Sequence, residues 1–224
     1  MSVTPHEESL VRSLPTASRL ALAYAPARTR LPTLALFALD ARLAGLLRNS
    51  REPMLAQLRF SWWRETLDRE ADEWPSGEPL LAALGSWQGE HRSLRKLVDG
   101  WEALTGNAPL SSGAIEEMAA GRAAAFGALA ATLGLGREAE AAEVLGREWA
   151  FADLAMKLGD QRERDVAAGL ARATLRRRAR VSRSLRPLLV LHGLAVHRME
   201  KGGYADGLPP SAVGKALRLG IFGR

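Results

Sequence analysis

The chain of 224 residues contains no cysteine. This absence excludes disulfide bonds, a thiol nucleophile, a cysteine-ligated zinc site and an iron–sulfur cluster, and it permits a reducing compartment. Lysine is also scarce, with 4 residues beside 27 Arg and 25 acidic residues. The net charge of +6 therefore rests on arginine. Such a bias arises from genome composition as readily as from an acidic partner, so charge alone identifies no function.

Residues that favour β-sheets are few. Val, Ile and Thr together number 19, whereas Leu and Ala together number 76. Because Leu and Ala are strong helix formers and β-branched residues suit strands, the composition predicts an all-α fold. A hydrophobic content of 47%, a charged content of 25% and six Trp indicate a packed globule.

Long hydrophobic runs are missing as well. The longest uncharged run, Ala123 to Gly136, has 14 residues, fewer than the roughly 20 that a membrane-spanning helix needs. The first residues, MSVTPHEESLVR, carry acidic side chains where a signal peptide carries basic ones. We expect a soluble, cytoplasmic protein whose membrane contact, if it has one, is peripheral to the inner membrane.

Common catalytic motifs are absent from the sequence. It has no Gly-x-Ser-x-Gly elbow, no Walker loop and no GxGxxG. His192 and His197 lie five residues apart, whereas a helical zinc pair needs a spacing of three or four. We interpret Glu65, Asp68 and Asp72 as a solvated helix end rather than a metal cluster.

Proline and glycine divide the chain into short-linked helical segments, and no repeat or long linker interrupts them. We therefore expect one domain over 1–224, an antiparallel helical bundle with a peripheral end at 202–224. The expected helices span residues 7–13, 16–25, 31–49, 53–72, 78–85, 90–105, 112–133, 137–159, 163–182, 187–200 and 210–220.

The segment 31–49 is apolar around its whole circumference, which predicts a central helix. Asp40 lies among its leucines, and a buried carboxylate there needs an arginine, a metal ion or a proton. We expect Asp40 to pair with Arg59 or Arg64. The segment 53–72 has two apolar sides, one formed by Met54, Leu55, Leu58 and Trp62, and predicts a helix packed on both sides.

The run LFALDARLAGLLRNSREPMLAQLRFSWWRETLD, within residues 19–72, resembles the squalene/phytoene synthase family. Weaker similarity continues through EEMAAGRAAAFGALAATLGL, REWAFADLAMKL and the end of the chain. The resemblance implies the all-α fold of isoprenoid synthases, whose enzymes join two isoprenoid diphosphates. In those enzymes two Asp-rich patterns hold Mg²⁺, which prefers oxygen ligands and neutralises the departing diphosphate.

Neither metal pattern is intact here. The first is expected near Leu47 to Arg51, where Leu47, Arg48 and Arg51 cannot bind Mg²⁺. The second is expected near LAMKLGDQRERD, where Asp160 and Asp165 lie five residues apart, about 140° around a helix. The sequence thus predicts the family's fold without its metal site.

Two further features each have two interpretations. Seven of the fifteen residues from 172 to 186 are Arg, and Arg172, Arg176, Arg180 and Arg183 form a stripe at helical spacing. This stripe is either a solvated face or a surface for anionic membrane or an acidic partner. Nucleic acid is a distant third, because no aromatic residues interleave with the arginines. The six Trp either line an isoprenoid-sized cavity or fill the core, and we favour the core.

Two hypotheses remain for function. The first is a non-catalytic, cofactor-free family member that binds an isoprenoid, another lipid or a protein near the membrane. Part of the family resembles assembly factors for respiratory complex I, and the Arg-Glu-Pro and Trp-Trp-Arg-Glu features are similar to that branch. The alternative is an Mg²⁺-dependent prenyltransferase. Its diphosphate would bind Arg48, Arg51, Arg59 or Arg64, and its metal would bind Asp153, Asp160 or Asp165. Asp40 completes the set of candidate binding residues.

Overall fold

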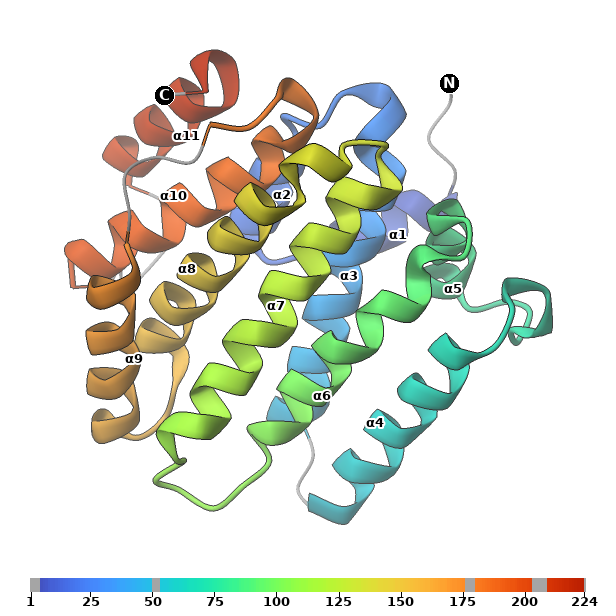
Figure 1. Cartoon of the computed structure of the whole chain (residues 1–224), viewed down its shortest axis with the longest axis horizontal. Helices are drawn as coiled ribbons and strands as arrows, with labels where there is room; N and C mark the ends of the chain where they lie inside the picture. Colours follow the sequence, from blue (N-terminus) through green and yellow to red (C-terminus); the bar gives the residue numbers. More distant parts are fainter. Residues whose placement is uncertain (1–4, 50–52, 176–179, 203–208, 224) are drawn as a thin grey trace.

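A computed structural model describes residues 5–49, 53–175, 180–202 and 209–223. These residues form helices and no strand, which confirms the all-α prediction (Figure 1). The α-helices are α1 (Pro5–Ser13), α2 (Thr16–Leu22), α3 (Ala27–Asn49), α4 (Pro53–Asp68), α5 (Pro79–Leu84), α6 (Arg95–Ala103), α7 (Ser112–Thr132), α8 (Ala139–Lys157), α9 (Gln161–Thr174), α10 (Arg186–Glu200) and α11 (Pro210–Phe222). Short 3-10 turns are η1 (Ala71–Glu73), η2 (Gly85–Trp87), η3 (Glu90–Leu94), η4 (Gly136–Glu138) and η5 (Arg183–Leu185).

Local side chains set several helix starts. The Ser111 hydroxyl accepts a hydrogen bond from the Ala114 amide at the start of α7. The Asp160 carboxylate accepts from the amides of Arg162 and Glu163 at the start of α9. Both are N-caps, which satisfy amides that lack an intrahelical partner. The sequence placed most helices correctly, but the predicted helix 163–182 is wrong in extent because α9 ends at Thr174.

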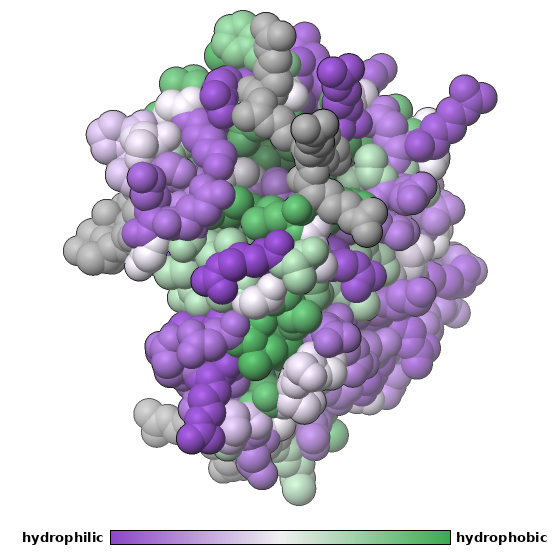
Figure 2. Space-filling model, turned by 60° about the vertical axis from the view of Figure 1, so that its left-hand side comes forward, coloured by the Kyte–Doolittle hydropathy of each residue, from purple (hydrophilic) through white to green (hydrophobic). Residues whose placement is uncertain are grey.

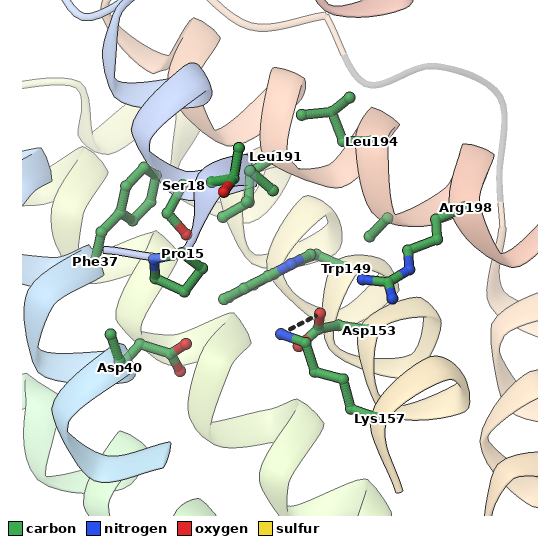
Figure 3. A pocket seen from close by; sticks show the side chains of 14 residues that line it. Pro15, Ser18, Phe37, Asp40, Trp149, Asp153, Lys157, Leu191, Leu194 and Arg198 are labelled. Carbon is green, nitrogen blue, oxygen red and sulfur yellow. Dashed lines mark ion pairs between the residues drawn. The ribbon is translucent and has the colours of Figure 1, made fainter. Parts of the chain in front are cut away.

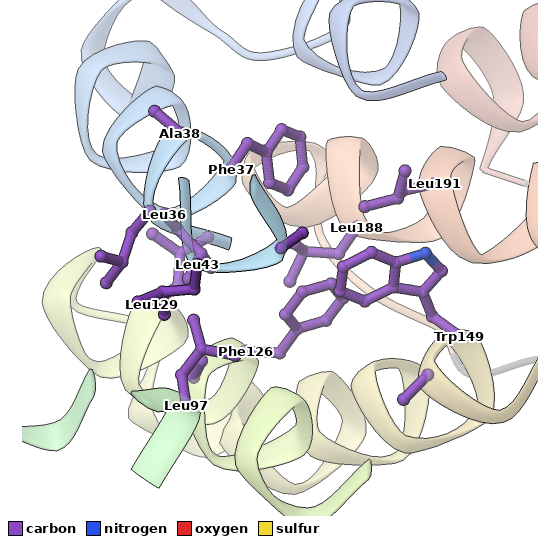
Figure 4. Packing of buried hydrophobic residues seen from close by; sticks show 14 of the residues in the cluster. Leu36, Phe37, Ala38, Leu43, Leu97, Phe126, Leu129, Trp149, Leu188 and Leu191 are labelled. Atoms are coloured by element: carbon purple, nitrogen blue, oxygen red, sulfur yellow. The ribbon is translucent and has the colours of Figure 1, made fainter. Parts of the chain in front are cut away.

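The core lies where α3, α7, α8 and α10 meet (Figure 1). Figure 4 shows Phe37 of α3, Phe126 of α7, Trp149 of α8 and Leu188 of α10 converging on it. In α3 every residue from Pro32 to Leu39 is buried, so the prediction of a central helix is confirmed. Four Trp are buried, at 63, 87, 101 and 149, in agreement with the core interpretation.

Helix α4 lies at the edge of the bundle and packs mainly on α6 (Figure 1). Its inner side buries Ala56, Phe60, Trp63 and Leu67. The other apolar side is exposed to solvent, so the prediction of a helix packed on two sides is wrong. We call this exposed side the α4 stripe, and it consists of Met54 (71% exposed), Leu55 (47%), Leu58 (62%) and Trp62 (42%). The sequence pattern showed that these residues share a side but not whether a neighbour covers it.

The carboxyl-terminal helix α11 packs against α10 and α2, with Ala212, Ala216 and Leu219 buried. On the face turned forward in Figure 2, hydrophobic residues show through a furrow between hydrophilic side chains. Among the described residues, no helix is both long and apolar enough to cross a membrane.

Candidate functional site

Arg122 of α7 is the centre of a buried charge network. Its side chain is 2% exposed. The guanidinium donates two hydrogen bonds to Asp40 of α3, Nε to Oδ1 and Nη2 to Oδ2, each 3.0 Å long. A third bond of 3.0 Å runs from Nη1 to Oδ2 of Asp153 on α8. One arginine thus ties together three central helices through both carboxylates.

Aromatic rings enclose this network. The Arg122 guanidinium carbon lies 4.0 Å from the centroid of the Trp149 ring and 5.1 Å from that of Trp101. The Trp101 indole nitrogen also donates to Asp40 Oδ1 at 2.9 Å. Arginine suits this position because its planar guanidinium forms paired hydrogen bonds with carboxylates and stacks on aromatic rings. The charge is therefore fully partnered inside the core.

The network favours the charged forms of Arg122 and Asp153. Burial opposes the charge on Arg122, but Asp40 and Asp153 outweigh it and raise the pKa of the guanidinium. Burial likewise opposes ionisation of Asp153, yet Lys157 and Arg122 together lower the pKa of that carboxyl. Lys157 Nζ lies 2.8 Å from Asp153 Oδ1, one helical turn along α8. Both oxygens of Asp153 therefore face a cation.

Very little space remains around Arg122. A cavity of about 10 Å³ lies between Leu36, Leu97, Phe126 and Trp149, which is room for about one water molecule. Two glycines allow the helices to close on this point. A Cβ added at Gly121 would lie 2.4 Å from the Lys96 carbonyl oxygen, and one at Gly146 would lie 2.8 Å from the Arg122 carbonyl oxygen. The helices therefore leave little space beside the Arg122 side chain.

A larger cavity of about 260 Å³ opens beside the network, between α2, α3, α8 and α10 (Figure 3). We call it the α10 cavity. Its apolar walls include Phe37, Trp149, Leu191 and Leu194. Its polar end carries Asp40, Asp153, Lys157 and Arg198.

The structure brings together only some of the predicted site residues. Asp40 and Asp153 meet at Arg122, whereas the expected pairing of Asp40 with Arg59 or Arg64 is wrong. Arg64 instead pairs with Asp99 and Glu102 of α6, and these acids raise the pKa of its guanidinium. Arg59 lies in a separate groove with Asn49, and Arg48 is exposed in the last turn of α3. The cause is that α4 packs on α6 rather than across the face of α3 that carries Asp40.

The remaining predicted residues lie elsewhere. Asp160 caps α9, and Asp165 is exposed and accepts a hydrogen bond from Gln161. Arg172 is exposed on α9 and Arg183 lies on η5, so the arginine stripe does not occupy one helix as predicted. Arg180 is exposed, while Arg51 and Arg176 lie outside the described residues.

The carboxylates present do not fit a magnesium site. Mg²⁺ needs free oxygen ligands, but Asp40 and Asp153 already bind Arg122, and a cation at the same place would be repelled. Within the described ranges, no three His, Asp or Glu side chains are grouped so that they could hold a metal ion.

Sequence reasoning missed Arg122, Trp101, Lys157 and Arg198. For Arg122 a signal existed, because it is the only charged residue between Glu117 and Arg137 in a Gly/Ala-rich helix. A lone charge in an apolar helix requires a buried partner. The partners themselves lie 82 and 31 residues away along the chain, and no sequence spacing links them.

Comparison with known proteins identifies the fold family. Residues 16–182 match the family model for squalene/phytoene synthase. No curated protein and no solved structure matched the chain. The matched region covers most of the chain, from α2 to the segment before α10, and includes Asp40, Arg122 and Asp153. The chain therefore belongs to the squalene/phytoene synthase family.

Proposed function

We propose that this protein is a non-catalytic member of its family that acts by binding. The observation that carries the proposal is Arg122, which occupies both Asp40 and Asp153 in the centre of the bundle. Metal-dependent departure of a diphosphate requires acidic side chains that are free to hold Mg²⁺. Here both central carboxylates are paired with Arg122, and a cavity of only about 10 Å³ is left beside its side chain.

We propose two modes of binding. The α10 cavity offers an isoprenoid or another lipid apolar walls and a polar end that carries Lys157 and Arg198. The α4 stripe offers a contact surface, since exposed apolar side chains in one patch often mark interaction sites. The arginines at 172, 180 and 183 would add attraction to an anionic membrane. The resemblance of the Arg-Glu-Pro and Trp-Trp-Arg-Glu features to the assembly-factor branch supports a partner in the respiratory complexes, at the periphery of the inner membrane.

A turnover assay tests the loss of catalysis. We expect no release of diphosphate from farnesyl or geranylgeranyl diphosphate in the presence of Mg²⁺. The alternative, a prenyltransferase, predicts Mg²⁺-dependent release that Asp153→Asn or Asp160→Asn abolishes. Turnover with that sensitivity would overturn the proposal.

A second experiment tests the binding surface. We expect the protein to co-purify with membranes, or with respiratory-complex subunits, in mild detergent. Leu58→Glu should reduce this association because it places a charge in the α4 stripe. Val166→Glu on α9 is the matched control, since Val166 is also exposed, at 39%, and is the only large exposed hydrophobic residue on the described part of that helix. If neither lipid nor respiratory-complex subunits co-purify with the wild type, the assignment of a membrane or respiratory partner fails. If Leu58→Glu associates with membranes or subunits as strongly as the control variant, the α4 stripe is not the contact surface.

A further inference from the structure

The α10 cavity holds an arginine that the charge network does not use. Arg198 of α10 lines the cavity, and its side chain reaches toward the Asp153 end (Figure 3). Its Nε atom is buried and has no hydrogen-bond partner. Within the described parts of the chain, no carboxylate lies within 4.0 Å of its guanidinium. A buried donor without an acceptor is costly. The side chain to which it belongs lines the cavity, where a ligand can supply acceptors to the guanidinium.

The charges around this cavity do not cancel. The cavity and the adjoining network contain two carboxylates, Asp40 and Asp153, and three cations, Arg122, Lys157 and Arg198. Arg122 binds both carboxylates and Lys157 binds the second oxygen of Asp153. Among the described residues of the cavity and the network, one positive charge remains, and it lies on Arg198.

Most of the remaining lining is apolar, with Thr16 and Ser18 as its polar members. Phe37, Trp149, Leu191 and Leu194 form walls that favour a hydrocarbon chain over water. The volume of about 260 Å³ lies just below the range for drug-sized ligands, which is roughly 300–1,000 Å³. The cavity therefore suits a chain of modest length with its head group at Arg198.

We propose that the α10 cavity binds an amphiphile with a single negative charge, whose anionic head pairs with Arg198 and whose chain lies between Trp149 and Leu194. This inference rests on the proposed binding function and names its ligand class. A diphosphate would bring about three negative charges beside Asp40 and Asp153, with only one unpaired cation to meet them. The cavity thus selects a head group different from that of the family's substrates.

Calorimetric titration of the purified full-length chain with decanoate, decanol, decylammonium and decyl phosphate tests the inference. We expect decanoate to bind at least about tenfold more tightly than decanol, as a charge-assisted hydrogen bond contributes that much. Decylammonium should not bind. Equal affinity for decanoate and decanol, or affinity for decyl phosphate more than about tenfold above that for decanoate, would overturn the single-charge assignment.

Matched variants locate the head group and the chain. Arg198→Gln should weaken decanoate binding about tenfold or more and leave decanol unchanged, while Arg137→Gln, an exposed arginine on η4, should change neither. Ala195→Leu narrows the cavity and should weaken both ligands. Circular dichroism confirms that each variant folds. Undiminished decanoate binding to Arg198→Gln refutes the site.

The outcomes separate this inference from the proposed function. If decanoate does not bind and farnesyl diphosphate is not turned over, the ligand class is wrong and the non-catalytic proposal stands. If farnesyl diphosphate is turned over with Mg²⁺, the non-catalytic proposal is wrong whatever decanoate does.

Discussion

Arg122 shows how one residue changes what a bundle centre can do. Its three hydrogen bonds and two aromatic neighbours satisfy a charge that is almost completely removed from water. A buried ion pair of this kind contributes little net stability compared with apolar residues of similar size, but removing one partner leaves an uncompensated charge. The network is therefore more important for the identity of the site than for the strength of the fold.

Replacing Arg122 should destabilise the protein strongly. We expect Arg122→Leu to lower the free energy of unfolding by about 3–5 kcal/mol, because Asp40 loses its charged partner and Asp153 keeps only Lys157. Urea denaturation measures the change. Arg64→Leu is the matched control, with partly exposed ion pairs that contribute about 0–1 kcal/mol. Similar losses of unfolding free energy in Arg122→Leu and Arg64→Leu would mean that the greater burial of Arg122 does not make its ion pairs more important for stability.

Asp153 predicts an acid-sensitive component of stability. Its pKa is lower in the folded chain than the value of about 3.9 for a free Asp, so the unfolded state binds the proton first as the pH falls. The contribution of Asp153 to the free energy of unfolding is complete above the pKa that this carboxyl has in the unfolded chain. It is lost as the pH falls through the lower pKa that the carboxyl has in the folded chain. Unfolding free energies measured from pH 6 to pH 3 should fall less steeply for Asp153→Asn than for the wild type. Asp165→Asn, an exposed site, should retain the wild-type slope.

Among the secondary structure elements, α4 has two apolar sides with opposite surroundings. Phe60 is completely buried against the bundle, while Leu58, two residues earlier, is 62% exposed. We expect Phe60→Ala to cost about 3–5 kcal/mol of unfolding free energy and Leu58→Ala to stay within about 0.5 kcal/mol. Chemical denaturation of the two variants measures both. A large loss for Leu58→Ala would show that the α4 stripe is covered in the folded protein.

The close contact of α6 with α7 depends on Gly121. A methyl group there would meet the Lys96 carbonyl, which is a backbone atom and cannot rotate away. We expect Gly121→Ala to destabilise the chain by about 1–3 kcal/mol through overpacking. Gly169→Ala on α9 is the control, because no atom lies within 4 Å of its added Cβ. That change should stabilise the helix by about 0.5–1 kcal/mol, measured in the same denaturation series.

For the whole molecule, the core extends past the region matched by the family model. That match ends at residue 182, yet α10 buries Leu188, Leu189, Val190, Leu191 and Leu194 and supplies one wall of the α10 cavity. Helix α11 then packs on α10 and α2. The carboxyl-terminal helices are therefore part of the bundle rather than an appendage.

Removing α11 should lower the stability of the whole domain. Truncation after Gly202 uncovers the surface on which Leu219 packs, and burial of a leucine alone contributes about 1.5–3 kcal/mol. We expect the melting temperature to fall by at least about 3 °C in a calorimetric scan. Leu217→Ala, at an exposed position of the same helix, should leave it nearly unchanged. An unaltered melting temperature after truncation would contradict the integration of α11.

The sequence predicts the helices of the fold better than it predicts the contacts of the candidate site. Helix positions follow from apolar periodicity, caps and proline, which are local properties, and α3 was correctly predicted to be central from its own residues. The side of α4 that packs was not predictable, because both sides are apolar and the neighbour decides. The partner of Asp40 was not predictable either. The neighbouring apolar residues of α3 show that its carboxylate requires a partner, but the arginine that pairs with it lies on α7.

The sequence by itself determined an all-α chain of this family with a carboxylate, Asp40, on an apolar central helix that requires a partner for its charge. Only the tertiary structure decided that Arg122 joins Asp40 to Asp153, that little space remains beside Arg122, and that Arg198 lines a cavity next to this network. The physical reason is the range of the interactions. Helix propensity acts within a few residues, while a buried charge is satisfied by whichever helix the packing brings beside it.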